Sequence, residues 1–366
     1  MKPTNKILRP AHIACTLLIT LFCLATFQTA RAQNIGDVQV LATFPTPPGF
    51  PEGVAVNGSR VYVSGPARFG NAGEPPSKVI AYDIATGATV REYAMQGENT
   101  ALDHANSCIA FDGAGRLYVV NTQLGIVRID IGTGAQEPYA ATLPNLPPCN
   151  SAPAPCSPTF IDLPPLPNDI AFDEDGNLYL TDSFQATIWR IAPGGGQPQI
   201  WFQSAQLDRP FGANGLRISP DRTKVYFAVT AEGVDPMTGA FLGGKIYTLP
   251  LVNAPAQSDL QVFHQYNGEA PDGIAFGRSG KLYVVEAAPF NSGISILRAD
   301  GTEEARLTNT VNPIDPYDSP ANAAFDKHGS LLVTNHAFLT GIPTHFTILK
   351  VFVDDKGLPL IRPDLP

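Results

Sequence analysis

Charged residues, tryptophan and cysteine are scarce in this chain of 366 residues. Only 16% of the residues are charged, and the chain contains 2 Trp, 3 Met and 5 Cys. Helical periodicity is missing after the N-terminal segment, and Gly (33) and Pro (35) are too frequent for a helical bundle. The hydrophobic fraction of 44% is too high for a disordered chain. The composition therefore predicts an all-β globular protein.

Acidic residues are absent from the first 32 positions and outnumber basic residues in the rest of the chain. All 33 Asp and Glu follow position 32, together with 20 of the 24 Lys and Arg. Because such an acidic surface repels phosphate backbones, we expect no nucleic-acid partner. The same surface would suit a cation.

The N-terminus has the three parts of a signal peptide. Three basic residues precede position 10, an apolar run covers positions 13–27, and Ala30-Arg31-Ala32 is a small-x-small cleavage pattern. The apolar run is shorter than the roughly 20 residues that a membrane span needs. We therefore expect residues 1–32 to be a signal peptide cleaved after Ala32. The mature protein would be secreted or periplasmic, without membrane contact.

Three cysteines remain after the expected cleavage. Cys149 and Cys156 flank a Pro-rich loop, and in an oxidising compartment this spacing favours a local disulfide over a metal site. Cys108 lies inside an apolar strand, where it is expected to be a buried free thiol.

A pair of strand patterns recurs at intervals of about 45 to 60 residues, the spacing of propeller blades. Each copy consists of an apolar strand, a tight polar turn and a second strand rich in aromatic and β-branched residues. The first strands of the six copies begin near Pro51, Ser107, Pro167, Ala213, Pro271 and Pro320. This repeat predicts one domain over residues 33–366, a six-bladed β-propeller. A two-domain sandwich is the alternative, but it leaves the unbroken repeat unexplained.

Ring closure in a propeller requires the first and last segments of the chain to pair. Residues 38–44 and 347–353 are both strand-like and are candidates for sharing the final blade.

The residue at the head of each first strand should line the mouth of the central channel. These ring residues are Glu52, Ser107, Asn168, Asn214, Asp272 and Ala321. Two carboxylates and two amide oxygens form a hard, doubly negative set that matches Ca²⁺ or another divalent cation, and the absence of His and Cys disfavours zinc. Considered alone, each of these four residues could be an ordinary turn residue. In common register, Glu52 and Asp272 would repel each other unless protonated or neutralised by a cation.

Other polar residues belong near the same face. The second strands end in polar residues that we expect to form an outer ring, namely Asn121, Asp182, Glu286 and Asn335. These residues would orient the metal ligands or would simply be solvated strand ends. Asp169 could bind a deeper ion or cap its turn. His104 and His336 are the two candidate proton carriers, although a plain surface role is an alternative for both. The other histidines examined, His264, His328 and His345, fall in turns or loops away from the ring.

The sequence resembles the six-bladed propeller superfamily of gluconolactonase, regucalcin, paraoxonase, diisopropyl fluorophosphatase and strictosidine synthase-like proteins. The resemblance covers residues 33–366. Its most specific element is the segment 167–183, supported by Pro51-Glu52-Gly53, Ala213-Asn214-Gly215-Leu216 and Pro271-Asp272-Gly273. In that family the Glu, the two Asn and the Asp of these motifs hold the catalytic divalent cation. The resemblance therefore implies this role for Glu52, Asn168, Asn214 and Asp272.

The resemblance further implies hydrolysis of a lactone, ester or phosphoester. Asp272 would act as general base or nucleophile. The sequence shows no clear paraoxonase-like histidine dyad, so the proton-transfer group is unassigned, and His104, three residues upstream of Ser107, is the candidate. The Pro-rich insert from Leu143 to Pro167 is expected to overhang the open face. Strictosidine synthase-like condensation depends on a lid glutamate that the sequence does not reveal.

Two rival hypotheses belong to other functional classes. The first is a secreted propeller that binds a protein or sugar and catalyses nothing. The second is a redox propeller with a quinone cofactor, which is disfavoured because Arg and Lys are absent from every ring position.

Overall fold

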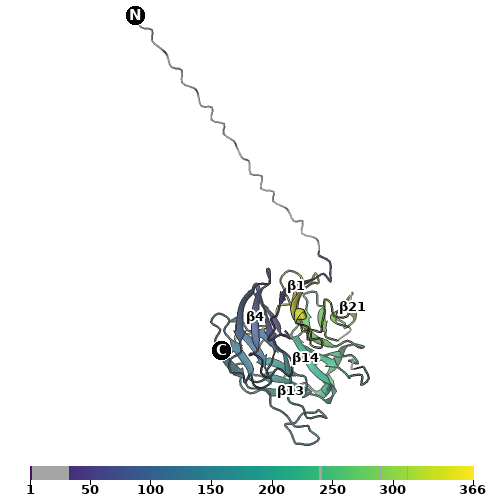
Figure 1. The fold of residues 1–366 in the computed structure, drawn as a ribbon. Helices are drawn as coiled ribbons and strands as arrows, with labels where there is room; N and C mark the ends of the chain where they lie inside the picture. The colour runs from purple at the N-terminus through teal and green to yellow at the C-terminus, as the bar shows by residue number, and fades with distance from the viewer. Residues whose placement is uncertain (2–32, 239–240, 289–290, 311) are drawn as a thin grey trace. The chain divides into compact units, whose positions relative to one another are not determined.

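Strands arranged in six sheets make up the described part of the chain. The computed structural model describes Met1 and residues 33–238, 241–288, 291–310 and 312–366. Each sheet has four antiparallel strands, and the sheets follow one another around a ring (Figure 1). Asn34–Pro366 forms one compact unit. The predicted all-β, six-bladed propeller is thus confirmed, whereas the expected signal peptide and its cleavage site lie outside the described residues.

The first three blades follow the chain order from the channel outward. Blade 1 consists of β2 (Val54–Asn57), β3 (Arg60–Gly65), β4 (Lys78–Asp83) and β5 (Thr89–Ala94). Blade 2 consists of β6 (Asn106–Phe111), β7 (Leu117–Asn121), β8 (Gly125–Ile129) and β9 (Gln136–Ala140). Blade 3 consists of β10 (Pro167–Phe172), β11 (Leu178–Asp182), β12 (Thr187–Ile191) and β13 (Gln199–Gln203).

Blades 4 and 5 have the same order. Blade 4 consists of β14 (Phe211–Ile218), β15 (Lys224–Ala231), β16 (Lys245–Pro250) and β17 (Gln261–Gln265). Blade 5 consists of β18 (Pro271–Phe276), β19 (Leu282–Glu286), β20 (Gly293–Leu297) and β21 (Glu303–Thr308). Among the described residues the only helical turns are three short 3₁₀ segments, Ala205–Leu207, Gln257–Asp259 and Pro343–His345.

Blade 6 combines both ends of the ring. Three of its strands are β22 (Pro320–Phe325), β23 (Ser330–Asn335) and β24 (Thr347–Phe352), and the outermost is β1 (Val38–Thr43). Val38 pairs with Val351, and Thr43 pairs with Thr347. In Figure 1, β1 accordingly lies beside the last strands of the chain. The predicted sharing of the final blade by residues 38–44 and 347–353 is therefore confirmed.

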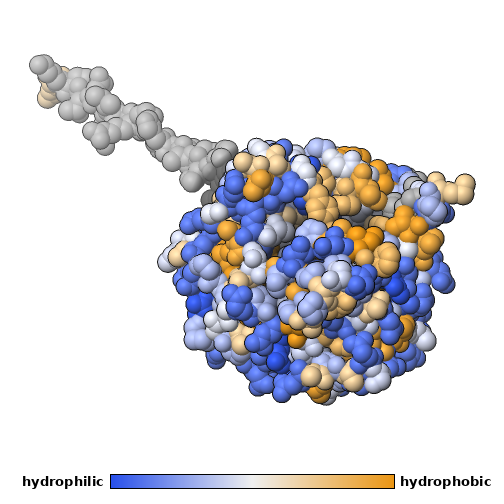
Figure 2. All heavy atoms as spheres, turned by 90° about the horizontal axis from the view of Figure 1, so that it is seen from below, coloured by the Kyte–Doolittle hydropathy of each residue, from blue (hydrophilic) through white to orange (hydrophobic). Residues whose placement is uncertain are grey.

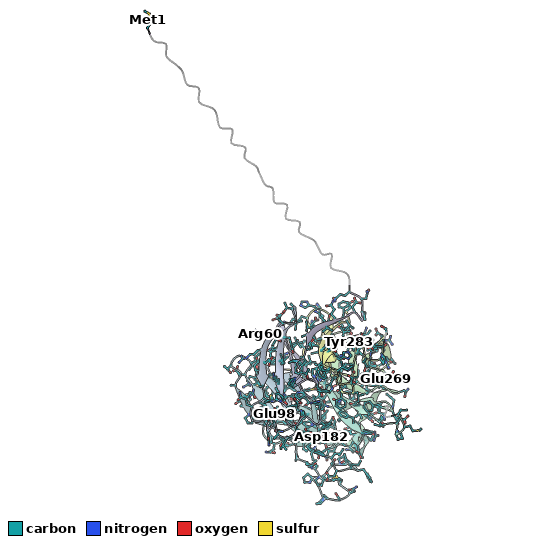
Figure 3. All side chains as sticks on the ribbon, in the orientation of Figure 1. Met1, Arg60, Glu98, Asp182, Glu269 and Tyr283 are labelled. Carbon is teal, nitrogen blue, oxygen red and sulfur yellow. A yellow bond between two sulfur atoms is a disulfide. The ribbon has the colours of Figure 1, made fainter. Side chains whose placement is uncertain are left out.

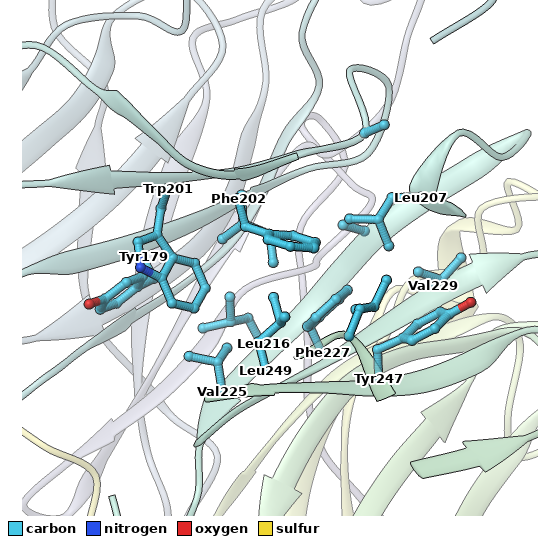
Figure 4. Close-up of a cluster of buried hydrophobic side chains, with 14 of the residues drawn as sticks. Tyr179, Trp201, Phe202, Leu207, Leu216, Val225, Phe227, Val229, Tyr247 and Leu249 are labelled. Atoms are coloured by element: carbon cyan, nitrogen blue, oxygen red, sulfur yellow. The ribbon is translucent and has the colours of Figure 1, made fainter. Parts of the chain in front are cut away.

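Hydrophobic contacts between neighbouring blades hold the ring together. One cluster joins blades 3 and 4: Tyr179 packs edge-on against Trp201 in blade 3 with ring centroids 4.8 Å apart, and Phe227 stacks on Tyr247 in blade 4 (Figure 4). Burying each such side chain contributes roughly 1.5–3 kcal/mol. Second, third and fourth strands supply these residues, because aromatic and β-branched side chains fit a pleated surface that is covered on both faces.

The cysteines have the expected states. Cys149 and Cys156 form a disulfide within the insert, and Cys108 is a buried free thiol with 1% of its surface exposed. In the described part of the chain, no helix has the length and apolar character needed to cross a membrane. On the side that Figure 2 presents, the surface is mainly hydrophilic, with scattered hydrophobic patches.

Candidate metal centre

Three of the four predicted ligands lie at irregularities in the innermost strands, and Glu52 lies just before β2. In blades 3, 4 and 5 the pairing of the first and second strands shifts register around Asn168, Asn214 and Asp272. Such bulges release a residue from the regular ladder and redirect its side chain. The motif residues are thereby held by strands but are free to point into the channel.

Neighbouring innermost strands approach each other closely at this level. A Cβ atom on Gly215 would lie 2.7 Å from the Cα atom of Gly273, and one on Gly273 would lie 2.5 Å from the Cα atom of Asn322. Only glycine fits at these two positions without moving the backbone. The glycine that follows each ring residue in blades 4 and 5 therefore lets the strands converge around the axis.

The two amide oxygens of the predicted ligand set have no hydrogen-bond partner. The Asn214 Nδ2 atom donates to Thr230 Oγ1 at 2.9 Å, and the Asn168 Nδ2 atom approaches Ser183 Oγ at 3.4 Å. These contacts fix the orientation of both amides and leave the buried Oδ1 atoms of Asn168 and Asn214 unpartnered. Because buried polar atoms are nearly always hydrogen-bonded, two such oxygens indicate that something is missing from the protein alone.

The two carboxylates of the set are destabilised by burial and by each other. Burial, followed by repulsion from Asp169, raises the pKa of Glu52 to about 8. Burial, followed by the charges of Glu52, Asp169 and Glu286, raises the pKa of Asp272 well above its usual range. Asp272 keeps part of its surface exposed, whereas Glu52 is only 8% exposed. A cation between them would relieve this repulsion.

The four predicted ligands thus lie in or before the first half of the innermost strands, and their chemistry fits a hard divalent cation. They supply two carboxylates and two amide oxygens, the donors that Ca²⁺ prefers. In the described residues no group of three His, Cys, Asp or Glu side chains could hold a metal, so any such site depends on the two amides. Cation binding itself stays a prediction.

A layer of polar side chains closes the channel beneath the ring. Asp169 accepts hydrogen bonds from Leu216 N at 2.8 Å and Arg217 Nη1 at 2.7 Å, which makes a buried ion pair. Asn322 Nδ2 contacts Cys108 Sγ at 2.9 Å in the same layer. Asp169 is therefore occupied by Arg217, which disfavours the deeper ion considered from the sequence.

Sequence reasoning overlooked Arg217. The position that it occupies in the first strand of blade 4 is alanine in all the other blades, namely Ala55, Ala110, Ala171, Ala275 and Ala324. This single exception to a repeated residue was the available signal. Its guanidinium supplies the positive charge that the ring positions themselves lack.

Three residues of the expected outer ring accept hydrogen bonds from the backbone of nearby loops, and the fourth, Glu286, does not. Asp182, labelled in Figure 3, accepts hydrogen bonds from several loop donors, including Leu166 N at 3.0 Å and Trp189 Nε1 at 3.2 Å. Asn121 and Asn335 cap their loops in the same way. Glu286, by contrast, is fully buried, both of its carboxylate oxygens are unpartnered, and burial raises its pKa well above the usual range. It adds negative potential beside Asp272.

His104 is held on both sides by backbone carbonyl groups. Its Nδ1 atom lies 2.9 Å from Leu102 O, its Nε2 atom lies 3.0 Å from Pro75 O, and 1% of the residue is exposed. Burial opposes its charge, but these carbonyls and the charges of Glu98 and Asp103 outweigh burial and raise its pKa. This geometry favours a structural role, and proton transfer by His104 stays a prediction.

His336 is an equally constrained candidate. Its Nε2 atom lies 2.8 Å from Ala67 O, and burial lowers its pKa to about 4. It is therefore neutral at physiological pH.

Three aromatic side chains border the mouth of the channel, and we call them the aromatic rim. Phe69 stacks on Phe184 with centroids 6.1 Å apart, and Phe184 meets Phe211 edge-on at 5.8 Å. Phe69 follows the second strand of blade 1 and Phe184 follows that of blade 3, so the stack spans the end of blade 2. Asp103 holds the Phe69 loop through Gly70 N and Ala72 N. An apolar surface thus adjoins the candidate metal centre.

The insert adds further apolar side chains to its surroundings. Phe160 and Ile161 are 81% and 62% exposed, and Phe160 N donates to Asp208 Oδ2 at 2.9 Å. This bond ties the insert to the loop before β14. A cavity of about 550 Å³ lies elsewhere, at the opposite end of the channel.

Comparisons with known proteins agree with this architecture. No family model matches the chain. Over 187 residues the chain is 28% identical to a gluconolactonase of Zymomonas mobilis subsp. mobilis, and the aligned part covers 45% of this chain and 46% of that protein. The match therefore spans less than half the length of the curated relative.

Solved structures resemble nearly the whole propeller. A calcium-binding protein, regucalcin, from Agrobacterium tumefaciens str. C58 has a TM-score of 0.59 at 19% identity, over 89% of this chain and 96% of that chain. A putative gluconolactonase has a TM-score of 0.56 at 16% identity, over 88% and 94%. A virginiamycin B lyase from Staphylococcus aureus has a TM-score of 0.52 at 15% identity, over 86% and 99%.

These identities establish the fold but not the reaction, since a lyase shares it too. We conclude that the chain is similar over part of its length to a gluconolactonase and has the six-bladed β-propeller fold found in regucalcin and gluconolactonase-like proteins.

Proposed function

We propose that the protein is an exported, divalent-cation-dependent hydrolase of a lactone, ester or phosphoester, with Ca²⁺ as the expected ion. The observation that carries the proposal is that two buried amide oxygens without hydrogen-bond partners occur in the same ring of residues as two carboxylates with raised pKa values. The gluconolactonase homologue supports a lactonase-type reaction. The calcium-binding regucalcin of the same fold supports the choice of ion.

Glu52, Asn168, Asn214 and Asp272 would hold the cation. When bound, the ion would polarise the carbonyl or phosphoryl oxygen and stabilise the negative charge that develops on it. The amide nitrogens of Asn168 and Asn214 keep their oxygen atoms aimed at the site by contacting Ser183 and Thr230. Little reorganisation is therefore needed when the substrate arrives.

Asp272 is the group best placed to accept a proton from water or to attack the substrate. It is the one residue of the four that is partly exposed. Glu52, Asn168 and Asn214 are buried, with 8%, 5% and 1% of their surfaces exposed. The neighbouring charges of Glu52 and Glu286 raise its affinity for a proton. A general base needs such a shift toward the working pH.

The aromatic rim would contact the part of the substrate that does not react. Phe69 is 56% exposed, and Phe184 and Phe211 are partly exposed. Apolar contact with these rings would hold an acyl or aryl group beside the carboxylate of Asp272.

Export is supported by the N-terminal sequence and by the disulfide. The basic start, apolar run and small-x-small pattern match a signal peptide. The Cys149–Cys156 disulfide is of a kind that persists in oxidising compartments.

A substrate panel with and without chelator tests the proposed function. The panel would contain glucono-δ-lactone, an alkyl γ-lactone, phenyl acetate and an aryl phosphotriester, each assayed in EDTA and after addition of excess Ca²⁺. We expect hydrolysis of at least one substrate that is lost in EDTA and restored by Ca²⁺. Undiminished activity in EDTA would contradict the cation requirement. Calcium binding without hydrolysis of any substrate would favour the non-catalytic binding protein.

A further inference from the structure

A second concave site lies at the end of the channel opposite to the candidate metal centre. Residues 356–366, which we call the strap, cross this end of the ring. Leu358 N donates to Phe276 O of blade 5 at 2.9 Å, and Gly113 N of blade 2 donates to Pro363 O at 2.8 Å. Between the strap and the innermost strands lies a cavity of about 550 Å³. This volume is within the range of about 300–1,000 Å³ typical of small-molecule sites.

The strap is fixed to the ring by direct bonds. Arg362 Nη2 donates to Val56 O at 2.6 Å, Arg362 Nη1 donates to Asn57 Oδ1 at 3.2 Å, and its guanidinium lies over the Phe111 ring. Ile361 packs against the hydrophobic cluster between blades 3 and 4. The cavity is therefore formed in advance of any ligand.

The cavity walls are apolar side chains contributed by several blades. Residues from all six blades and the strap line it, and the large apolar ones include Phe111, Phe172, Ile218, Phe276, Phe325 and Ile361. The small side chains of Ala55, Ala110, Ala171, Ala275 and Ala324 leave the space at the level where Arg217 projects. Such walls suit an apolar ligand body.

The charge of the lining is opposite to that of the protein as a whole. The chain has a formal net charge of −9, yet the lining contains six basic residues and one acidic residue. The basic residues are Arg217, Arg222, Arg278, Lys327, Lys356 and Arg362. The acid, Asp326, is already paired with Lys350 at 3.0 Å.

In the described part of the chain, four of these basic residues have no carboxylate partner: Arg362, which bonds to Val56 and Asn57, and the exposed Arg278, Lys327 and Lys356. Arg217 and Arg222 pair with Asp169 and Glu174, outside the lining. Across the described ranges of the chain, no carboxylate lies within 4.0 Å of the charged groups of Arg278, Lys327 or Lys356. Three exposed cations at the rim of an apolar cavity form a surface that attracts an anion.

We propose that this cavity binds an amphipathic monoanion, a carboxylate that carries an apolar chain. The chain would lie against the phenylalanine and alanine walls, and the carboxylate would face Arg278, Lys327 and Lys356. The site is separate from the candidate metal centre, because the Asp169–Arg217 ion pair and its layer lie between them. The proposal therefore holds whether or not the other end of the channel is catalytic.

Titration calorimetry of the full mature chain with decanoate tests the proposal, with 1-decanol as the neutral counterpart. We expect saturable binding of decanoate, about tenfold tighter than that of decanol, and weaker binding as salt is added. The variant Arg278→Gln/Lys356→Gln should weaken decanoate binding about fivefold. The matched control Arg60→Gln/Lys224→Gln removes two exposed cations that do not line the cavity and should bind decanoate like the wild type.

Three results would overturn the proposal. One is the absence of saturable decanoate binding by a folded protein. Another is equal weakening by the cavity variant and the control variant, which would mean that only general charge matters. The third is a protein that does not bind free decanoate but adsorbs to anionic phosphatidylglycerol vesicles through Arg278 and Lys356. That result would make this end of the ring a membrane-docking surface instead.

Discussion

The two ends of the central channel differ in charge, in side-chain partners and in shape. One end carries Glu52 and Asp272 with unpartnered amide oxygens from two blades. The other carries unpaired cations, apolar walls and a strap of chain. The same six innermost strands build both ends, so the fold does not dictate the chemistry. The residues at the start of each innermost strand determine the chemistry of one end, and the residues in its second half determine that of the other.

Replacing Asp272 should have the largest effect at the acidic end. We expect Asp272→Asn to reduce kcat/KM by about 10³-fold, because it removes both a cation ligand and the proposed base. In EDTA the variant should have a higher Tm than the wild type, since one of two repelling buried carboxylates is gone. In excess Ca²⁺ the order should reverse, because only the wild type gains binding energy, about 2.7 kcal/mol at 100 times Kd.

Activity assays and thermal unfolding in both buffers measure this crossover. Asp175→Asn is the matched control, because Asp175 is exposed in the β10–β11 turn and should change neither quantity. Equal stabilisation of wild type and Asp272→Asn by Ca²⁺ would remove Asp272 from the ligand set.

The acidic end should also give the protein a pH-dependent stability that the cation abolishes. Burial raises the pKa of Glu52 from 4.5 to about 8, so the folded state holds this proton more tightly than the unfolded state. In EDTA the free energy of unfolding should therefore fall as pH rises from about 5 to about 8, by up to about 1.4 kcal/mol per pH unit. Urea unfolding at several pH values measures it. A slope unchanged in Glu52→Gln, or by Ca²⁺, would contradict this assignment.

His104 tests whether the loops around the acidic end are structural or catalytic. His104→Gln should lower stability at pH 6 by about 1–3 kcal/mol, because buried Leu102 and Pro75 carbonyls lose a donor. The raised pKa means that this contribution is complete below about 6.5 and is lost as pH rises through the folded-state value. We expect kcat to change by less than about threefold. Unchanged unfolding with a large loss of kcat would make His104 the proton carrier.

The aromatic rim should have the smallest effect. Phe69→Ala should raise KM for phenyl acetate about fivefold and leave kcat unchanged, because Phe69 would contact only the part of the ester that does not react. Leu360→Ala, at the other end of the channel, is the control for an exposed apolar residue. If both variants behave alike, the rim is not part of the substrate site.

The sequence was sufficient for the parts of the molecule that repeat. Because equivalent positions of propeller blades meet at one radius, Glu52, Asn168, Asn214 and Asp272 could be placed together from register alone. Aromatic second strands and Gly turns likewise predicted the blades. The structure added the bulges at which Asn168, Asn214 and Asp272 leave the regular strand pairing.

Features that depend on loop paths could not be predicted. The stack of Phe69 on Phe184 joins blades 1 and 3, and the carbonyls that hold His104 come from two loops. No period in the sequence relates such segments. The strap was equally hidden, because it has no strand pattern. Arg217 left one signal, the replacement of an alanine that the other five blades share, but the repeat does not predict its partner Asp169.

The shared sixth blade has a consequence for how the chain reaches its native state. β1 can find its place only beside β24, which is separated from it by some three hundred residues. Contacts this distant in sequence are the slowest to form. During synthesis the circle must stay open until β24 has left the ribosome. Export in an unfolded form would be compatible with this order of events, since a chain that cannot close early also cannot fold prematurely.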